Sequence, residues 1–501
     1  MSAPTPGTAE SPPATILSSN PVPRFRLRTF LAIDERDAVI RMAQTAIGKL
    51  LIFVAAVLTV ATLLPWWESA WVVSAAMAAA LLPNLRTPIL LIATWVAAFL
   101  EMGLSQNHIL ADIGVVLQQE NVANWSATVL ASSSLLVVML GSWLALCATR
   151  RNPQSFLARR PLLTLLLLEV VLCGLSASPV THGLMRVMLW SLLVVLTPYV
   201  WFLPFAIMDQ RSREPSQPLL QMALLRPFWS PAYLPFGKGS SLLRKTLSKT
   251  PSDLTITQLK AIKLLVWSNL LFGMKTALEW AGEHLLIIPK LQQVIEAFLN
   301  GHAHPIATRW LSLIFEVTTY SLNIALWAAL FISIARLAGY RLPRGSWRPL
   351  QSRTLMDYFN RFHYYFKELL VDLFFMPTFF TLFKRHPRLR MFCATFMAAG
   401  VGNAIWHFFY EIRLLATMGL TNALETYTSY AFYCVVLATG IGLSQVRANM
   451  GIRPPSTPLG RVYSFLFVWS FVVCLHVFGD GSRNHTLNER GRFLASLFGV
   501  F

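Results

Sequence analysis

Histidine side chains are the first candidates for chemistry in this sequence, because imidazole exchanges a proton near neutral pH, with an unperturbed pKa of about 6.5. The chain has ten histidines, and seven of them fall in polar segments between apolar runs, where a solvated surface position is the simpler interpretation. The other three are His363, His407 and His476. His476 lies near the end of the last apolar run, and we interpret it as structural.

His407 ends a stretch of small residues that begins at Ala398 and includes Gly400 and Gly402. Small residues let neighbouring helices approach closely inside a membrane, so this stretch is expected near the centre of a helical bundle. An ionisable group at such depth is a functional candidate, and imidazole is suited to general-base catalysis. The alternative is a neutral imidazole that is satisfied by one neighbouring polar group. The residues alone leave both interpretations open.

His363 lies in a segment of another kind, residues 354–380, which we call the aromatic segment. Five charged side chains make it too polar to cross lipid, and its many Phe and Tyr residues make it too apolar for water. A re-entrant or interfacial helical segment packed against a helical bundle satisfies both properties.

The elements that must position these side chains are membrane-spanning helices. Of the 501 residues, 55% are hydrophobic and 13% are charged, against about 25% charged in a soluble domain. The missing charge leaves apolar runs of about 20 residues, the length at which a helix crosses the hydrocarbon core. These runs are continuous rather than alternating, which favours helices over a β-barrel. We therefore expect an all-α polytopic integral membrane protein with about 10–12 transmembrane helices.

The expected spans can be placed along the chain, and the charges between them set an orientation. Lys and Arg gather in every second connection, which by the positive-inside rule places the amino terminus in the cytoplasm. The exception is the tail after the last span, where Arg483, Arg490 and Arg492 would lie outside. The expected spans are residues 45–64, 70–84, 86–104, 126–147, 161–178, 186–208, 260–281, 308–335, 391–415, 424–445 and 462–479.

This pattern divides the chain into five parts. They are a disordered basic cytoplasmic tail (1–44), amino-terminal transmembrane helices (45–208), a cytoplasmic basic loop (209–258), a catalytic transmembrane core containing the aromatic segment (259–480) and a carboxyl-terminal tail (481–501). The basic loop contains Gly237-Lys238-Gly239-Ser240, but Ala232 stands where a phosphate-binding loop needs its first glycine. No strand precedes it either, so we exclude a phosphate loop.

Charge and cysteine usage indicate which partners to expect. The net charge of +19 does not indicate nucleic acid, since most basic residues lie between apolar runs, where they attract anionic lipid headgroups. Membrane lipid is therefore an expected partner. The five cysteines lie inside apolar runs without a Cys-x-x-Cys pair, which predicts small buried side chains rather than disulfides or a zinc site. No metal is expected.

Two short motifs resemble a known family. Tyr358-Phe359-Asn360-Arg361-Phe362-His363 is followed 44 residues later by Trp406-His407 in an apolar helix. Together they resemble the membrane-bound O-acyltransferase family, which includes proteins of alginate O-acetylation and teichoic-acid D-alanylation. The resemblance covers residues 350–415 and is imperfect: phenylalanines replace the usual tryptophans of the first motif, Asn360 replaces a basic residue, and Phe408 follows His407 where glycine is common.

The resemblance implies transfer of an acyl group, with acetyl expected first, from a cytoplasmic thioester such as acetyl-CoA to a hydroxyl of an extracytoplasmic polysaccharide or lipid-linked acceptor. It implies that His407 is the general base, and that His363 orients the thioester or stabilises the oxyanion. Arg361, Asn360 and Trp406 would contact substrate. Acyl-CoA or an acyl carrier would be a co-substrate, with no bound cofactor. A bacterial inner membrane and an extracytoplasmic acyl-relay protein as partner are also implied.

Two readings without acyl chemistry stay open. A transporter or flippase fits the number of spans, and acidic residues within spans could relay protons. Those acids are Glu169, Glu279, Glu316 and Glu411. Against it stands the absence of a detectable internal repeat, which many transporters have. The third reading is a scaffold of a polysaccharide-export complex in which both histidines are structural.

Overall fold

The structure is a computed structural model that describes residues 32–103, 109–231, 234, 238–479 and 485–500. Within these ranges the chain folds into helices without β-strands, and the only bridge is an isolated one between Leu247 and Tyr340. The all-α prediction is confirmed. Residues 1–31 of the expected disordered tail (1–44) lie outside the described residues, whereas its end is helical, in η1 (Ile33–Glu35) and α2 (Asp37–Gln44), so disorder was wrong there.

Eight helical stretches of the described chain are long and apolar enough to cross a membrane, which confirms an integral membrane protein with many spans. A bent pair, α2 (Asp37–Gln44) and α3 (Ala46–Val60), joined at 96°, would make a ninth. This is fewer than the ten to twelve expected. The eight stretches are Pro83–Leu100 in η2 (Pro83–Leu85) and α5 (Arg86–Gly103), α7 (Ala127–Arg151), Gly183–Trp201 in α10 (Gly183–Leu196) and η3 (Thr197–Trp201), α14 (Pro251–His284), α16 (Ile306–Leu337), Pro387–Tyr410 in α20 (Pro387–Phe396) to α21 (Asn403–Tyr410), α23 (Leu420–Asn449) and α24 (Pro458–Gly479).

The difference in number comes from two short helices. The expected spans at 70–84 and 161–178 form α4 (Trp66–Leu81) and α9 (Pro161–Ala177), with 16 and 17 residues. A helix of 17 residues rises about 26 Å, slightly less than the roughly 30 Å of hydrocarbon. Both helices pack within the bundle, α4 against α3, α5 and α16, and α9 against α10 and α11 (Leu203–Asp209).

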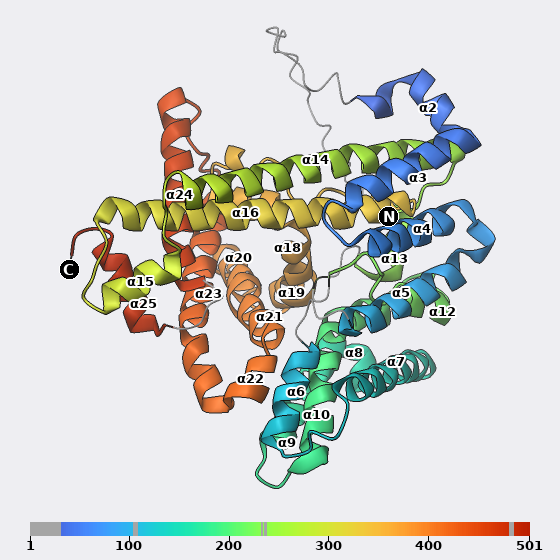
Figure 1. The fold of residues 1–501 in the computed structure, drawn as a ribbon, viewed down its shortest axis with the longest axis horizontal. Helices are drawn as coiled ribbons and strands as arrows, with labels where there is room; N and C mark the ends of the chain where they lie inside the picture. The colour runs from blue at the N-terminus through green and yellow to red at the C-terminus, as the bar shows by residue number, and fades with distance from the viewer. Residues whose placement is uncertain (1–31, 104–108, 232–233, 235–237, 480–484, 501) are drawn as a thin grey trace, which may run out of the picture.

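The helices form three groups (Figure 1). The long helices α14 and α16 run side by side across the molecule, with α3 to α5 packed at one end. Helices α6 (Ile109–Gln119), α7, α9 and α10 (Gly183–Leu196) form a second group below them. The third group, from α17 (Leu355–Phe362) to α24, lies beside the long pair and contains both candidate histidines.

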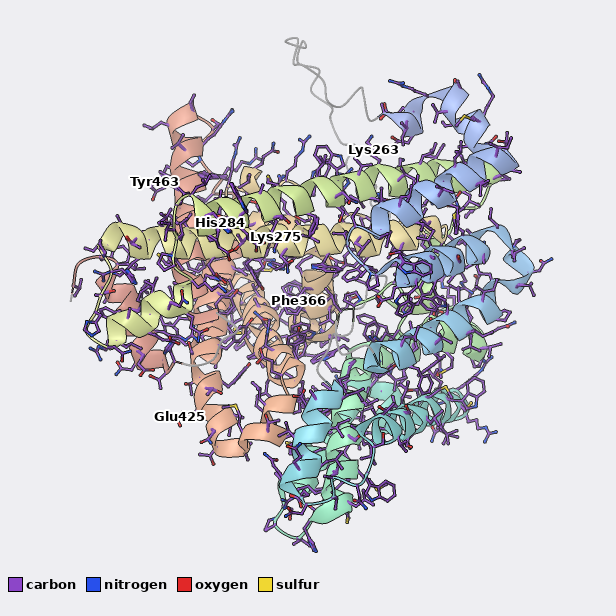
Figure 2. All side chains as sticks on the ribbon, viewed as in Figure 1. Lys263, Lys275, His284, Phe366, Glu425 and Tyr463 are labelled. Atoms are coloured by element: carbon purple, nitrogen blue, oxygen red, sulfur yellow. The ribbon has the colours of Figure 1, made fainter. Side chains whose placement is uncertain are left out.

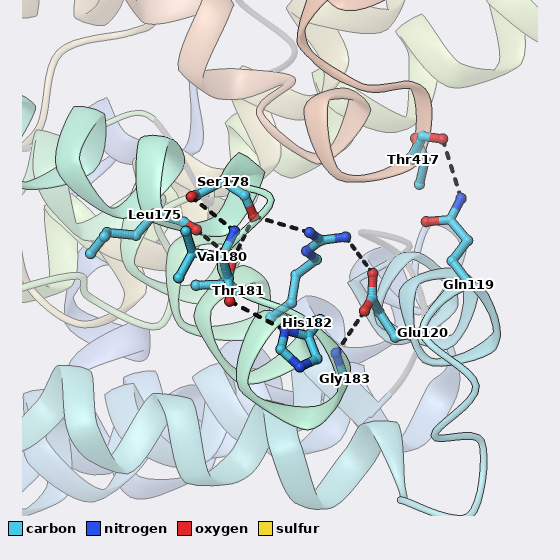
Figure 3. A network of polar contacts seen from close by, with 10 residues as sticks. Gln119, Glu120, Leu175, Ser178, Val180, Thr181, His182, Gly183 and Thr417 are labelled. Carbon is cyan, nitrogen blue, oxygen red and sulfur yellow. Dashed lines mark hydrogen bonds and ion pairs between the residues drawn. The ribbon is translucent and has the colours of Figure 1, made fainter.

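Polar contacts surround the end of α6, where the second group meets the third (Figure 3). The Glu120 carboxylate pairs with Arg186 at 2.6 Å and accepts a hydrogen bond from the backbone N–H of Gly183. Arg186 also donates to the carbonyl of Ser178. Beside this pair, the Gln119 side chain donates to the carbonyl of Thr417 at 3.4 Å. The end of α6 is thereby joined both to the α9–α10 connection and to α22 (Arg413–Met418).

The basic segment 209–258 is folded rather than an open loop. It contains α12 (Pro218–Ala223), α13 (Gly239–Thr246) and the first turns of α14. One carboxylate oxygen of Asp209 accepts three hydrogen bonds, from the backbone N–H of Ser216, the Gln221 amide and the Ser240 hydroxyl, at 2.8–3.1 Å. Burial would raise the pKa of Asp209, but these hydrogen bonds outweigh it and lower the pKa. The ionised carboxylate therefore organises the segment.

The arginines after the last span were the exception to the positive-inside rule, and the surroundings of Arg490 explain its place there. Residues 487–496 form α25, and Arg490 is only 1% exposed. Its guanidinium donates to the carbonyls of Val477, at 2.6 Å, and His485, at 3.2 Å. Val477 lies in the last turn of α24, where the helix dipole favours a positive charge. The charge of Arg490 thus serves packing rather than orientation; Arg483 lies outside the described residues.

Candidate functional site

The aromatic segment folds into four short helical pieces: α17, α18 (Tyr364–Leu370), the π-helical turn η5 (Val371–Phe375) and α19 (Met376–Thr381). Its predicted helical character is confirmed. The Thr354 hydroxyl caps α17 by accepting from the N–H of Asp357 at 3.1 Å. His363 is the break between α17 and α18, with backbone angles φ −113° and ψ 48°. The break lets the two helices turn around the imidazole.

The helix that carries His407 is continuous from α20 (Pro387–Phe396) through the π-helical turn η6 (Met397–Gly402) to α21 (Asn403–Tyr410). Its π-helical turn packs against that of the aromatic segment, and π turns inside α-helices often mark functional sites. A Cβ atom on Gly402 would lie 2.6 Å from the Phe374 ring, and one on Gly400 would lie 3.0 Å from Ala438. The small residues therefore allow the close approach that the sequence predicts.

Replacing Gly402 with alanine is expected to lower the free energy of unfolding by about 1–3 kcal/mol, because the added methyl group overlaps the buried Phe374 ring. Gly141→Ala in α7 is the matched control, since nothing lies within 4 Å of a Cβ at that position. There the extra helix propensity of alanine should leave stability equal or slightly higher. Unfolding midpoints in detergent measure both. Equal midpoints for the two variants would contradict the close packing of the π turns.

His407 is half-buried inside a group of aromatic rings. Its ring centroid lies 4.2 Å from that of Tyr430 on α23, 4.7 Å from Trp406 and 6.1 Å from Phe366 of the aromatic segment. Trp406 in turn contacts Phe366 at 4.8 Å and stacks on Tyr410. The arrangement brings Trp406 and His407 together with the aromatic segment. Rings on several sides of the imidazole restrict the access of water to it.

His363 lies between the rings of Phe359 and Phe362, at centroid distances of 5.7 and 4.4 Å. Burial lowers the pKa of His363 to about 4, so its imidazole is neutral around pH 7. No ring contact joins it to His407 among the described residues. Phe366, three residues after His363, packs against His407. The aromatic segment thus reaches His407 through Phe366, whereas His363 itself packs against Phe359 and Phe362.

The lowered pKa of His363 predicts a pH-dependent stability. The unfolded chain binds a proton at about pH 6.5 and the folded chain only near pH 4, so folding is weakened as the pH falls through this window. The full shift corresponds to about 3 kcal/mol, and partial exposure reduces it. We expect His363→Gln to show a flatter fall of the unfolding midpoint between pH 6.5 and 4 than the wild type. Parallel curves would show that the imidazole is not desolvated.

Arg361 and Asn360 have different surroundings. The Arg361 guanidinium pairs with Asp357 at 2.6 Å, one turn earlier in α17, and the Arg361 carbonyl accepts from the N–H of Trp347. Its charge is therefore neutralised locally, which leaves less for attracting an anionic substrate than expected. Asn360 is exposed and faces a cavity.

That cavity, which we call the inner cavity, has a volume of about 280 Å³ and lies between the aromatic segment and the helices η6, α20 and α23. Its walls are mostly apolar. Phe366 forms part of the wall, so the ring that contacts His407 also faces the cavity. Figure 2 places Phe366 in the middle of the molecule. Its polar lining residues are Asn360, Lys367, Glu368, Thr395, Asn403 and Gln445.

Asn403 is the functional candidate that the sequence analysis missed. It is only 3% exposed, and its fully buried carboxamide oxygen has no hydrogen-bond partner within the described part of the chain. A buried, unsatisfied carbonyl oxygen costs about 1–3 kcal/mol, so such groups need an explanation. Asn403 precedes His407 by four residues and shares its helix face. This spacing of four residues from His407 was the signal in the sequence that could have identified Asn403.

A second missed cluster joins the basic segment to the aromatic segment. Lys238 Nζ lies 2.5 Å from the Glu368 carboxylate and 2.8 Å from that of Asp372. Burial lowers the pKa of Lys238, but the two carboxylates outweigh this and raise it. Lys238 has a left-handed backbone, with φ 51°. Because its ammonium group is taken by two carboxylates, it is not free to bind a phosphate, which agrees with the exclusion of a phosphate loop.

Metal and cofactor candidates are few. Among the described residues no three His, Cys, Asp or Glu side chains come together as a metal site would require. The five cysteines are unpaired; Cys434 is buried, as predicted for all five, whereas the other four are half-buried. His476 packs against Tyr320 at a centroid distance of 5.3 Å, away from the inner cavity lining. The chain matches no protein-family model, and no curated protein matches it.

Proposed function

We propose that this protein is a membrane O-acyltransferase in which His407 acts as the general base. The acyl group, acetyl in the first instance, would come from a cytoplasmic thioester such as acetyl-CoA and go to a hydroxyl of an extracytoplasmic polysaccharide or lipid-linked acceptor. The observation that carries the proposal is the inner cavity, whose wall contains Asn403 with its unsatisfied carboxamide oxygen and Phe366, the ring that packs against His407. The resemblance to membrane-bound O-acyltransferases supports the same assignment.

The proposed reaction is an acyl transfer with general-base catalysis by His407. The acceptor O–H gives its proton to an imidazole nitrogen of His407 while its oxygen attacks the thioester carbonyl carbon. The carbonyl π bond opens to an oxyanion, which then re-forms the carbonyl as the C–S bond breaks. The leaving thiolate takes the proton from the imidazolium, so the base is regenerated. The aromatic rings around His407 limit competing attack by water.

In the proposed reaction, Asn403 and His363 would assist by hydrogen bonding. A carboxamide can donate and accept hydrogen bonds, so Asn403 can hold an amide or hydroxyl of a substrate in the inner cavity. His363 is neutral near pH 7 and can therefore donate one hydrogen bond without carrying charge. Arg361 is better assigned to holding α17, through Asp357, than to binding the donor. Lys384, Arg385 and Arg388 are exposed and suit an anionic carrier.

Asn403→Leu separates a binding role from a structural one. Leucine has nearly the same size and removes the unsatisfied oxygen, so we expect the free energy of unfolding to rise by about 1–3 kcal/mol. The same change should lower kcat/KM for acyl transfer at least about tenfold, because one substrate hydrogen bond is lost. Unfolding midpoints and initial rates measure the two effects. If the variant unfolds earlier than the wild type, Asn403 is a structural residue instead.

The rival transport function has weaker support in the described residues. The Glu169 carboxylate accepts a hydrogen bond from Thr197 at 3.0 Å in the second helix group, and Glu279 pairs with Lys275 one turn away on α14. These two acids therefore have separate local partners and belong to different helix groups. Residence in a bacterial inner membrane, a cytoplasmic amino terminus and a relay partner on the outer side belong to the acyltransferase proposal.

The test is transfer from acetyl-CoA labelled in the acetyl group. Purified protein in detergent or liposomes is mixed with the donor and with carbohydrate and lipid fractions from its source, and both free CoA and labelled acceptor are measured. We expect equal amounts of CoA and labelled acceptor, with no label in the absence of protein. If neither acetyl-CoA nor longer acyl-CoA donors are consumed while a lipid or sugar crosses liposome membranes, the transport reading replaces this one.

A further inference from the structure

A second and larger cavity lies along the long helices α14 and α16. We call it the lateral cavity; it has a volume of about 1,010 Å³ and is lined by side chains of α14, α16 and α24. Its walls are apolar, and Met274, Ile314 and Leu466 in these walls are each about half exposed. Figure 2 labels Lys275 on α14 and Tyr463 on α24; both of these helices pack against α16. An apolar opening of this kind faces hydrocarbon in a membrane.

One part of the lateral cavity is strongly cationic. Arg344 and Arg348 line it, and both guanidinium groups lie over the exposed Trp347 ring, at 5.1 and 4.8 Å from its centroid. Neither side chain makes an ion pair or hydrogen bond among the described residues. Asp34, the acid whose charge reaches Arg344, is already paired with Lys263 at 3.0 Å. Among the described residues, these two adjacent positive charges therefore have no ion pair of their own.

The backbone at this position is unusual as well. Arg348 has φ 50° and ψ 54°, the left-handed conformation that favours glycine, directly before the short helix Pro349–Gln351. A bulky residue keeps such a conformation only when its surroundings hold it there, and strained positions often serve binding. The cavity also reaches Phe362, the neighbour of His363. A ligand in the lateral cavity would therefore lie close to the aromatic segment.

We propose that the lateral cavity binds an anionic phospholipid, with an acyl chain between α14, α16 and α24 and the phosphate on Arg344 and Arg348. Planar guanidinium groups match phosphate oxygens in pairs, and basic pockets between membrane helices recognise anionic headgroups. Trp347 is suited to the interface between headgroup and chain. The site is independent of acyl transfer, since none of these three side chains takes part in the proposed chemistry.

The test compares lipid retention by the wild-type protein and two double variants. Protein is purified in detergent and mixed with phosphatidylglycerol or phosphatidylcholine of identical chains, and bound lipid is counted by native mass spectrometry. Arg344→Gln with Arg348→Gln removes both cations. Arg150→Gln with Arg151→Gln changes the net charge equally at exposed positions at the end of α7. Each cation near an anionic headgroup strengthens lipid binding. The loss of both cations in the first variant is therefore expected to weaken its phosphatidylglycerol affinity about thirtyfold.

The wild type and the Arg150/Arg151 variant should retain phosphatidylglycerol, and all three proteins should bind phosphatidylcholine weakly. A third variant, Ala325→Phe, adds bulk to the apolar wall and should also reduce retention. The proposal is overturned if phosphatidylcholine binds as well as phosphatidylglycerol, or if both double variants lose affinity equally. Unchanged retention in Ala325→Phe would overturn the placement of the chain, because the headgroup alone would then account for binding.

Discussion

Replacing His407 by alanine is expected to reduce the rate of acyl transfer by about 10²–10⁴-fold, the usual contribution of a general base. The ring of His407 is enclosed by Tyr430, Trp406 and Phe366, and Phe366 also faces the inner cavity. With the imidazole gone, water or a weaker group must take the proton of the acceptor hydroxyl. The measurement is the initial rate of labelled acetyl transfer at matched protein concentration.

Two further variants make the result interpretable. His407→Gln keeps a polar side chain of similar length but cannot take a proton, so it should be as inactive as the alanine variant. His476→Ala is the matched control, because His476 also lies in a membrane helix and also contacts an aromatic ring, that of Tyr320. It should keep full activity. If His407→Ala transfers as fast as the wild type, His407 is a packing residue and the proposed mechanism is wrong.

The second large expected effect is a loss of stability, and it concerns Arg490 near the carboxyl-terminal end of the chain. Arg490→Ala should lower the free energy of unfolding by about 2–5 kcal/mol, because the carbonyls of Val477 and His485 lose a charged donor in a buried place. The loss should also release α25 from the end of α24. Thermal unfolding in detergent measures the first effect, and proteolysis of the carboxyl-terminal residues measures the second.

Arg492→Ala is the control for this experiment. Arg492 lies in the same helix, two residues further on, but is exposed. Its removal subtracts the same charge and should change the unfolding midpoint very little. Similar losses in both variants would mean that charge, and not the two buried hydrogen bonds, holds α25 in place.

Much of this fold could be predicted from the sequence because a bilayer imposes a local rule. Every backbone polar group in hydrocarbon must be bonded within its own segment, so apolar runs become helices wherever they occur. All eleven expected spans coincide with helices, including the short α4 and α9. Small residues before His407 predicted a close helix contact, and the contact of Gly402 with Phe374 confirms it.

The site itself is a matter of how helices are rotated against one another, which hydropathy does not encode. The pair of Arg361 with Asp357 is local, one turn apart in α17, whereas Lys238 reaches Glu368 across 130 residues of chain. The unsatisfied oxygen of Asn403 is evident only when every neighbour is in place. The sequence by itself determined the class of protein, the helices and the two candidate histidines. Only the tertiary structure decided which side chains face a cavity and which are already neutralised, because both depend on packing between distant segments.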